Sequence, residues 1–468
     1  MEKKNNIYDI LACICFFINQ LSIDEKKYIY QDYFTDQNKH KKYIEEKIDF
    51  LNRKSILGKV YYDQFNDDEI RGIFDKIIQW SKTNNDKKYL VAMLSYLEDY
   101  IDFEASFERF ISNECNDKNE YRSCFIALNS NTKDTYGKLL PCFKHKWKKN
   151  SKRSFSSLYA DPISVMKKYI WIENFKEWSV KNLYIHKWKV DNFFLRIACS
   201  PLSSQCPFDI KYEEIDANFF HIKYKEKPDM FVNIKNILSH ISATYDSNPK
   251  DILVFPEMMS SLNCLENSQK YISENWMESY PPLIFLPTCE YEVSPNKWVN
   301  SLKVLNNRGE EVFVYNKQNP FQLDKDDKKY FEHIMPDKKI TIIHVKGIGR
   351  IGVLICSDVF DINLTKFLFE EIKISLLLVQ AYSEGIDMFF QKMQQASCDV
   401  VWCNACAAHT RNNNEVVAYL PKGHKYSNTN YTVKNKCDKE CQGCLKEVII
   451  PLSYECNEMQ IIDELLGR

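Results

Sequence analysis

The sequence is poor in glycine, has almost no excess charge and contains no long hydrophobic segment. Only 11 of its 468 residues are glycine. Its one G-x-G-x-x-G run, residues 347–352, precedes a strand-like segment instead of opening a helix, which excludes a dinucleotide-binding loop there. The formal net charge of −1 provides no global field that would attract nucleic acid or a membrane. No apolar run approaches the roughly 20 residues of a membrane span, so we expect no membrane insertion.

The composition is that of a folded protein with several free thiols. Hydrophobic residues make up 44% and aromatic residues 14% of the chain, which is enough to form large cores. The 17 cysteines are an odd number and are scattered through apolar segments, a pattern typical of buried thiols in a reducing compartment. The apolar stretch at residues 10–18 is short, follows Asp9 and precedes no small-residue cleavage site, unlike a secretion signal. We therefore expect a cytoplasmic protein.

The first 185 residues show helical periodicity. Apolar side chains recur at helical spacing in four segments, residues 41–51, 70–80, 86–111 and 162–178. We therefore expect an all-α N-terminal domain over residues 1–185. A basic stretch at residues 144–153 is interpreted either as a charged linker or as a segment that grips phosphate backbones.

From about residue 190 the pattern changes to strands that alternate with helices. Short apolar runs such as residues 192–199 and 374–380 have the length and composition of buried strands. Residues 301–315 form two such runs around a turn at Asn306–Gly309, which predicts a hairpin. Alternating strands and helices are typical of an α/β layered domain, which we expect over residues 186–468.

Three strand-like runs in this second part lead to a residue with reactive chemistry. Glu257 follows Ile-Leu-Val-Phe-Pro, Lys317 follows Val-Phe-Val-Tyr-Asn, and Cys356 follows Arg-Ile-Gly-Val-Leu-Ile. Catalytic groups gather at the carboxyl ends of strands in α/β sheets, so we expect these three side chains to meet. A thiol, a base and a cation in one site suit acyl chemistry with the thiol as nucleophile.

Five segments together resemble the nitrilase, or carbon–nitrogen hydrolase, superfamily. They stand in the family's order: Phe255–Glu257, Asn300–Ser301, Tyr315–Lys317, Gly352–Asp358 and Asp399–Ala405. The similarity covers roughly residues 190 to 455. It implies an αββα sandwich that pairs as a homodimer or higher oligomer. It also implies hydrolysis or acyl transfer at amides, nitriles and related carbon–nitrogen bonds, with no metal or other cofactor required for catalysis.

The resemblance also implies roles for individual residues. Cys356 would attack the carbonyl or nitrile carbon to form a thioester, Glu257 would act as general base and then acid, and Lys317 would stabilise the oxyanion. A second carboxylate usually follows the lysine in this family, and the candidates here are Asp327 and Glu332. The function implied is cysteine-dependent hydrolysis of a non-peptide, amide-type carbon–nitrogen bond in a small molecule.

Four cysteines near the end of the sequence have the spacing of a metal site. Cys437, Cys441 and Cys444 stand within eight residues, and either Cys456 or His424 could complete a structural zinc site. The first three also match an iron–sulfur spacing. An acidic turn that carries incidental thiols is the remaining interpretation, and the sequence leaves all three open.

A second function from another class also stays open. The nitrilase-like domain would then be a non-catalytic scaffold or sensor, and residues 1–185 would bind a protein or nucleic-acid partner. Nitrilase-like domains also occur beside reverse transcriptases in bacterial phage defence, an association that suits a helical extension. A reactive Cys356 thiol favours the enzyme, and an inert one favours the scaffold.

Overall fold

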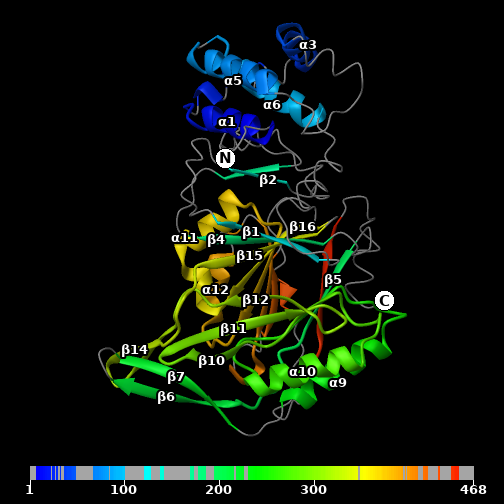
Figure 1. Ribbon diagram of the computed structural model, residues 1–468. Helices are drawn as coiled ribbons and strands as arrows, with labels where there is room; N and C mark the ends of the chain where they lie inside the picture. Colours follow the sequence, from blue (N-terminus) through cyan, green and yellow to red (C-terminus); the bar gives the residue numbers. More distant parts are fainter. Residues whose placement is uncertain are drawn as a thin grey trace. The chain divides into compact units, whose positions relative to one another are not determined.

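The computed structural model divides into two compact units. It describes residues 7–22, 24–26, 28–29, 32, 36–48, 67–83, 85–100, 121–127, 138–141, 169–172, 178–185, 194–214, 218–225, 230–345, 348–393, 396, 398–408, 415–419, 431–432 and 444–452. One unit comprises Met1–Lys144 and Ser151–Glu177, and the other comprises His145–Asn150 and Trp178–Arg468. The protein is therefore a mixed α/β molecule with a helical N-terminal region (Figure 1).

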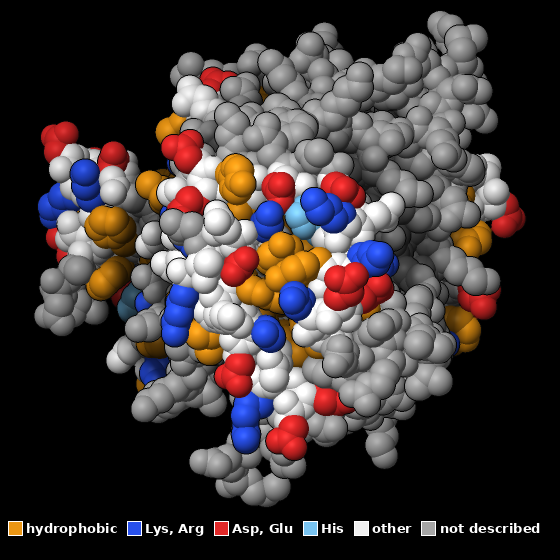
Figure 2. Space-filling view, turned by 90° about the horizontal axis from the view of Figure 1, so that it is seen from above, with side chains coloured by type: hydrophobic (Ala, Val, Ile, Leu, Met, Phe, Trp, Pro, Cys, Tyr) orange, Lys and Arg blue, Asp and Glu red, His pale blue; other side chains and the backbone are white. Residues whose placement is uncertain are grey.

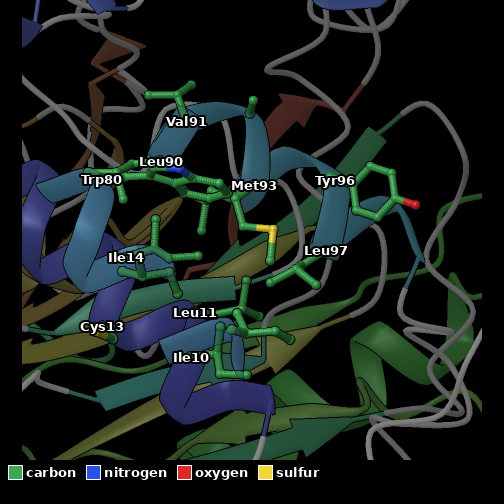
Figure 3. Close-up of a cluster of buried hydrophobic side chains, with 14 of the residues drawn as sticks. Ile10, Leu11, Cys13, Ile14, Trp80, Leu90, Val91, Met93, Tyr96 and Leu97 are labelled. Carbon is green, nitrogen blue, oxygen red and sulfur yellow. The ribbon is translucent and has the colours of Figure 1, made fainter. Parts of the chain in front are cut away.

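The helices of the first unit share one apolar core. They are α1 (Ile7–Asn19), α3 (Gln37–Lys47), α5 (Asp67–Lys82) and α6 (Lys88–Tyr100). In α5 the buried apolar residues are spaced three and four apart and form one face, whereas Ile10–Cys15 of α1 and Leu90–Leu94 of α6 are buried all round the helix. Ile10, Ile14, Trp80, Leu90 and Met93 meet in this core and are buried (Figure 3). The helices expected near residues 41–51, 70–80 and 86–111 are confirmed as far as residue 100.

Beyond residue 100 the prediction of an all-α region up to residue 185 is wrong. The described residues of that stretch form four strands, namely β1 (Tyr121–Ala127), β2 (Lys138–Pro141), β3 (Tyr169–Ile172) and β4 (Ser179–Ile185). The helix expected over residues 162–178 is replaced by β3 where the chain is described. Its sequence Tyr-Ile-Trp-Ile is aromatic and β-branched, which favours strands, and it pairs antiparallel with β2. Periodicity alone cannot distinguish so short an apolar run from a turn of buried helix.

Two large sheets of the second unit position the candidate site. One has the order β4, β15 (Lys339–Val345), β16 (Gly349–Ile355), β17 (Leu376–Ala381), β18 (Asp399–Asn404), β19 (Val416–Tyr419) and β20 (Tyr431–Thr432). The other has the order β10 (Cys289–Ser294), β11 (Lys297–Leu305), β9 (Leu283–Phe285), β8 (Ile252–Val254), β5 (Phe194–Cys199) and β21 (Lys446–Pro451), with β12 (Glu311–Asn316) paired to β11. The strands and helices predicted from residue 190 onward are present, but between residues 283 and 355 the described chain forms strands that follow one another without a helix.

The central strands of both sheets are buried on both faces. β16, β17 and β18 run parallel and every residue in them is buried, as in β8 and β9 of the other sheet. Parallel strands that are covered on both faces have continuous apolar sequences, so these strands could be recognised in the sequence. Helices α9 (Met230–Ala243) and α10 (Leu262–Glu274) share an apolar core with β5, β8 and β9.

A smaller sheet extends from the second unit. Its order is β13 (Gln322–Lys325), β14 (Lys328–Glu332), β7 (Asn218–Tyr224) and β6 (Phe208–Glu214). Figure 1 shows β6, β7 and β14 as a separate projection beyond β10 and β11. The remaining helical segments are η2 (Cys356–Phe360), α11 (Ile362–Lys366), η3 (Phe367–Glu371), α12 (Ile386–Met393) and η4 (Cys406–Ala408).

The described surface mixes charges of both signs. In Figure 2, blue and red side chains alternate around a small group of hydrophobic ones, consistent with the near-zero net charge. None of the helices in the described ranges is long and apolar enough to cross a membrane. The basic stretch at residues 144–153 lies outside the described residues.

The predicted hairpin around Asn306–Gly309 is confirmed. Substitution of Gly309, which lies in the turn of this hairpin, provides a test of the fold. Gly309 has φ +77°, and a Cβ atom there would lie 2.6 Å from the backbone nitrogen of Ser273 in α10. Gly309→Ala should therefore lower the free energy of unfolding by about 1–3 kcal/mol. Gly72→Ala is the matched control, because a Cβ on this exposed position of α5 meets nothing within 4 Å. It should raise stability by about 0.5–1 kcal/mol. Chemical denaturation measures both, and equal effects would contradict the turn geometry.

Candidate active site

Three strand ends deliver the predicted residues to one buried place. Glu257 lies three residues after β8, Lys317 follows β12 directly, and Cys356 follows β16 as the first residue of η2. Glu257 and Lys317 are each 1% exposed, and Cys356 is 2% exposed. Buried charges are costly unless they are paired, so the partners of each group decide what the site can do.

A buried ammonium between two carboxylates forms the centre of the site. The Nζ of Lys317 donates to Glu257 Oε1 at 2.8 Å and to Glu332 Oε2 at 2.6 Å. Glu332, the last residue of β14, is therefore the second carboxylate beside the lysine. Asp327, the other candidate, lies exposed in the turn between β13 and β14 with φ +58° and does not reach the site.

Asn300 and the backbone N–H groups of Tyr382 and Phe321 complete the binding of the carboxylates. The Nδ2 of Asn300 donates to Glu257 Oε1 and to Glu332 Oε1, both at 3.0 Å. The other oxygen of Glu257 accepts from the backbone N–H of Tyr382 at 3.0 Å. Sequence reasoning assigned Asn300 no role of its own. The available signal in the sequence was an asparagine within a strand-like run, and in the structure its amide is fully buried in β11.

Cys356 sits at a sharp turn of the backbone. Its φ is +45°, in the left-handed region that non-glycine residues seldom adopt. Such conformations cost about 1–3 kcal/mol and cluster at functional sites. The thiol lies beside the Glu257 carboxylate, whose charge adds to the rise that burial causes in the pKa of Cys356. The strand-to-helix turn thus aims the sulfur at the base.

Asp358 ties this turn to the segment that carries Lys317. One carboxylate oxygen accepts from the backbone N–H groups of Gln318 at 2.8 Å and Asn319 at 2.7 Å. The other accepts from the hydroxyl of Tyr315 at 2.8 Å and the N–H of Ile355 at 3.0 Å. Burial raises the pKa of Asp358 to about 7, while these donors act in the opposite direction. One side chain therefore positions both the turn that carries Cys356 and the segment that carries Lys317.

The pKa shifts at the site favour a neutral Cys356 thiol beside the ion pair of Glu257 and Lys317. Burial raises the pKa of Cys356 well above its usual value, and the Glu257 charge raises it further. Burial also raises the pKa of Glu257, and Lys317 opposes that rise. For Lys317, burial lowers the pKa, but attraction to Glu257 and Glu332 raises it more, so its pKa lies well above the ordinary value. At neutral pH the sulfur therefore keeps its proton and needs a base to become nucleophilic.

The predicted metal cluster falls mostly outside the described part of the chain. Cys437, Cys441 and Cys456 are not described, and neither is His424. Cys444 is half-buried just before β21. Among the described residues, no group of three or more His, Cys, Asp or Glu side chains is arranged to hold a metal ion.

The buried carboxylate of Asp358 yields a stability test. In Asp358→Asn an amide NH₂ would face groups that all donate, leaving at least one buried N–H unsatisfied. Each such group costs about 1–3 kcal/mol, so the free energy of unfolding should fall by at least about 2 kcal/mol above neutral pH. Asp361→Asn is the control. Asp361 caps α11 by accepting from Asn363 and Leu364, and asparagine caps helices equally well. An unchanged Asp358→Asn protein would contradict the four-donor arrangement.

Comparison with known proteins gives structural similarity alone. No family model and no curated protein matches the sequence. An amidase from Nesterenkonia sp. has 11% identity and a TM-score of 0.39, with 59% of this chain and 98% of that chain covered. A variant of the Nesterenkonia sp. AN1 amidase carries acrylamide added at its active-site cysteine. It has 11% identity and a TM-score of 0.38, with coverage of 58% and 99%. Saccharomyces cerevisiae Nit3, a member of branch 10 of the nitrilase superfamily, has 12% identity and a TM-score of 0.36, with coverage of 60% and 97%. Over about 60% of its length, this chain is structurally similar to nitrilase-superfamily amidases at low sequence identity.

Proposed function

We propose that this protein hydrolyses an amide-type, non-peptide carbon–nitrogen bond with Cys356 as the nucleophile. The observation that carries the proposal is the buried group of Lys317, Glu257 and Glu332 with the Cys356 thiol beside Glu257. A thiol, a base and a cation in contact, shielded from water, are the parts that acyl transfer needs.

The first half-reaction forms a thioester. Glu257 takes the proton of the Cys356 thiol while the sulfur attacks the carbonyl carbon, and the carbonyl oxygen becomes an oxyanion. A lysine ammonium has three N–H groups, and Glu257 and Glu332 accept two of those of Lys317. The third has no acceptor among the described residues and is available to the oxyanion. When the intermediate collapses, Glu257 returns its proton to the nitrogen, and ammonia or an amine leaves.

The second half-reaction releases the acid. Glu257, again a carboxylate, takes a proton from a water molecule that attacks the thioester carbon. Lys317 stabilises the second oxyanion in the same place. Collapse breaks the carbon–sulfur bond, and the proton on Glu257 returns to the sulfur, which regenerates the Cys356 thiol. Besides the two nucleophilic attacks, these steps need only proton transfers by Glu257 and stabilisation of the oxyanion by Lys317. None of them needs a metal or a redox cofactor.

The surroundings of the triad favour a small substrate. The three reacting groups are almost fully buried, which leaves no room for a folded polypeptide. Met258, next to Glu257, belongs to an apolar cluster with Phe208 and Tyr330 of the small sheet, and Phe321 and Tyr382 pack against this cluster. An amide whose acyl portion is small and partly apolar matches such neighbours.

The burial of Cys356 favours a second candidate, a non-catalytic scaffold. A thiol that is 2% exposed and whose pKa is raised reacts poorly with solutes. In this function the ion pair of Lys317 would only stabilise the fold. The two candidates differ in whether wild-type protein cleaves any amide at all.

Activity of point variants tests the catalytic proposal. Cys356→Ala removes the nucleophile and Lys317→Ala removes the oxyanion partner, so ammonia or amine release from a panel of small amides should fall to background in both. Release is measured with a coupled ammonia assay or by chromatography of the acid product. Cys398→Ala is the control, because this buried thiol precedes β18 at the opposite end from the site and should keep wild-type rates.

Folding must be checked separately in Lys317→Ala, because it leaves two carboxylates buried without a cation. Lys317→Met keeps most of the volume and serves as a second variant if the alanine protein unfolds. Wild-type rates in Cys356→Ala, or in a folded Lys317 variant, would refute the proposed mechanism. A wild-type protein inert toward the whole panel would favour the scaffold.

A further inference from the structure

A second buried cluster of titratable groups lies directly behind Asn300. Glu290 of β10 has a fully buried carboxyl group, and His221 of β7 has a side chain that is 8% exposed. The Glu290 Oε1 accepts from the N–H of Ile222 at 3.1 Å and lies 3.5 Å from His221 Nδ1. The other ring nitrogen of His221 lies 2.9 Å from Nδ1 of His333. The proposed reaction uses none of these groups.

Two acceptor oxygens in this region lack a donor. Asn300 uses its Nδ2 for Glu257 and Glu332, while its Oδ1 is buried and has no hydrogen-bond partner in the described part of the chain. The same holds for Oε2 of Glu290. Glu290 and Asn300 are register partners in the antiparallel pair β10–β11. Side chains of directly opposed residues lie on the same face of a sheet, with Cβ atoms about 4.5–5.5 Å apart.

A proton on Glu290 resolves this arrangement. If Glu290 were ionised, its Oε2 and the Oδ1 of Asn300 would both be buried hydrogen-bond acceptors without a donor. Each unsatisfied buried group carries a desolvation cost. With the proton on Oε2, one consistent hydrogen-bond chain results. Glu290 donates to Oδ1 of Asn300, and Asn300 donates to both carboxylates of the site. Both unsatisfied oxygens then have a partner, and the bonds run in one direction from Glu290 to the two carboxylates.

We propose that Glu290 is a positioning residue that stays protonated and holds the Asn300 amide in the orientation that clamps Glu257 and Glu332. Without this bond the amide can rotate, and its oxygen would then face the two carboxylates. Glu290 therefore fixes the base and the second carboxylate without touching the substrate. Because the bonds of the chain run in one direction, they also strengthen one another in the low-dielectric interior.

The surroundings keep Glu290 neutral. Burial raises the pKa of Glu290, and the negative charge of Glu332 adds to the rise, against hydrogen bonds from His221 and Ile222. Burial and the neighbouring His221 lower the pKa of His333, which keeps that ring neutral at physiological pH. Among the described residues, the charged or titratable groups that face this cluster are Glu213, Tyr224, Cys289, Glu332 and the two histidines themselves.

A pair of substitutions separates this role from simple packing, given the proposed amide hydrolysis. Glu290→Gln supplies an N–H where the acid supplies its O–H, so kcat/KM should stay within about twofold of wild type. Glu290→Ala removes the donor, and kcat/KM should fall by about tenfold or more, the usual cost of a lost buried hydrogen bond. Glu292→Gln, on an exposed residue of the same strand, is the control and should match wild type. A glutamine variant as impaired as the alanine variant would overturn the proposal.

An infrared measurement tests the proton directly and needs no activity. The carbonyl stretching band of a protonated carboxylic acid should be present in wild type at neutral pH and weaker in Glu290→Gln by one group. An unchanged band would mean that Glu290 is ionised and would overturn the proposal, even if Glu290→Ala does not fold. If wild type cleaves no amide but the band is lost in Glu290→Gln, the proposed function fails while the protonated Glu290 stands.

Discussion

The ion pair that buries the Lys317 ammonium between Glu257 and Glu332 is the interaction on which the rest of the site depends. Moving each of these charges out of water costs several kcal/mol, and only short contacts with further hydrogen bonds repay that cost. The distances of 2.8 and 2.6 Å meet this condition. Asn300 and the N–H of Tyr382 supply further hydrogen bonds to the carboxylates. Removal of the lysine would leave two buried carboxylates without a cation, so the ammonium holds the group together.

The two large sheets are joined at the edge where this group lies. Gln380 of β17 donates its amide hydrogens to the carbonyl oxygens of Phe255 and Leu286, at 2.6 and 2.9 Å. The N–H of Glu257 donates to the carbonyl oxygen of Ala381 at 3.3 Å. These bonds fix the strand end that carries Glu257 against the sheet that carries Cys356. Rigid strand ends hold reacting groups more exactly in place than loops do, which suits a thiol that must reach its base.

The features that follow from local sequence patterns could be predicted. Those that depend on contacts between residues far apart in the chain could not. Buried parallel strands have a continuous apolar signature, so the runs before Glu257 and Cys356 could be recognised, and strand-end geometry predicted that their side chains meet. The sequence alone could not decide between Asp327 and Glu332. The choice depends on the register of the β13–β14 hairpin, which places only Glu332 against Lys317. The link from Glu290 to Asn300 has no local signature, since it arises from pairing between two strands. The strands between residues 121 and 185 were missed because short apolar runs fit either period.

The most direct test of the account is the detection of an acyl group on Cys356. Wild-type protein is mixed with a small amide, quenched in acid during turnover and digested, and the peptide that contains Cys356 is examined by mass spectrometry. The account predicts a mass increase equal to the acyl portion of the amide on this peptide, absent when Glu257 is replaced by glutamine. Amide cleavage without any acyl group on Cys356, or with the acyl group on another cysteine, would contradict it.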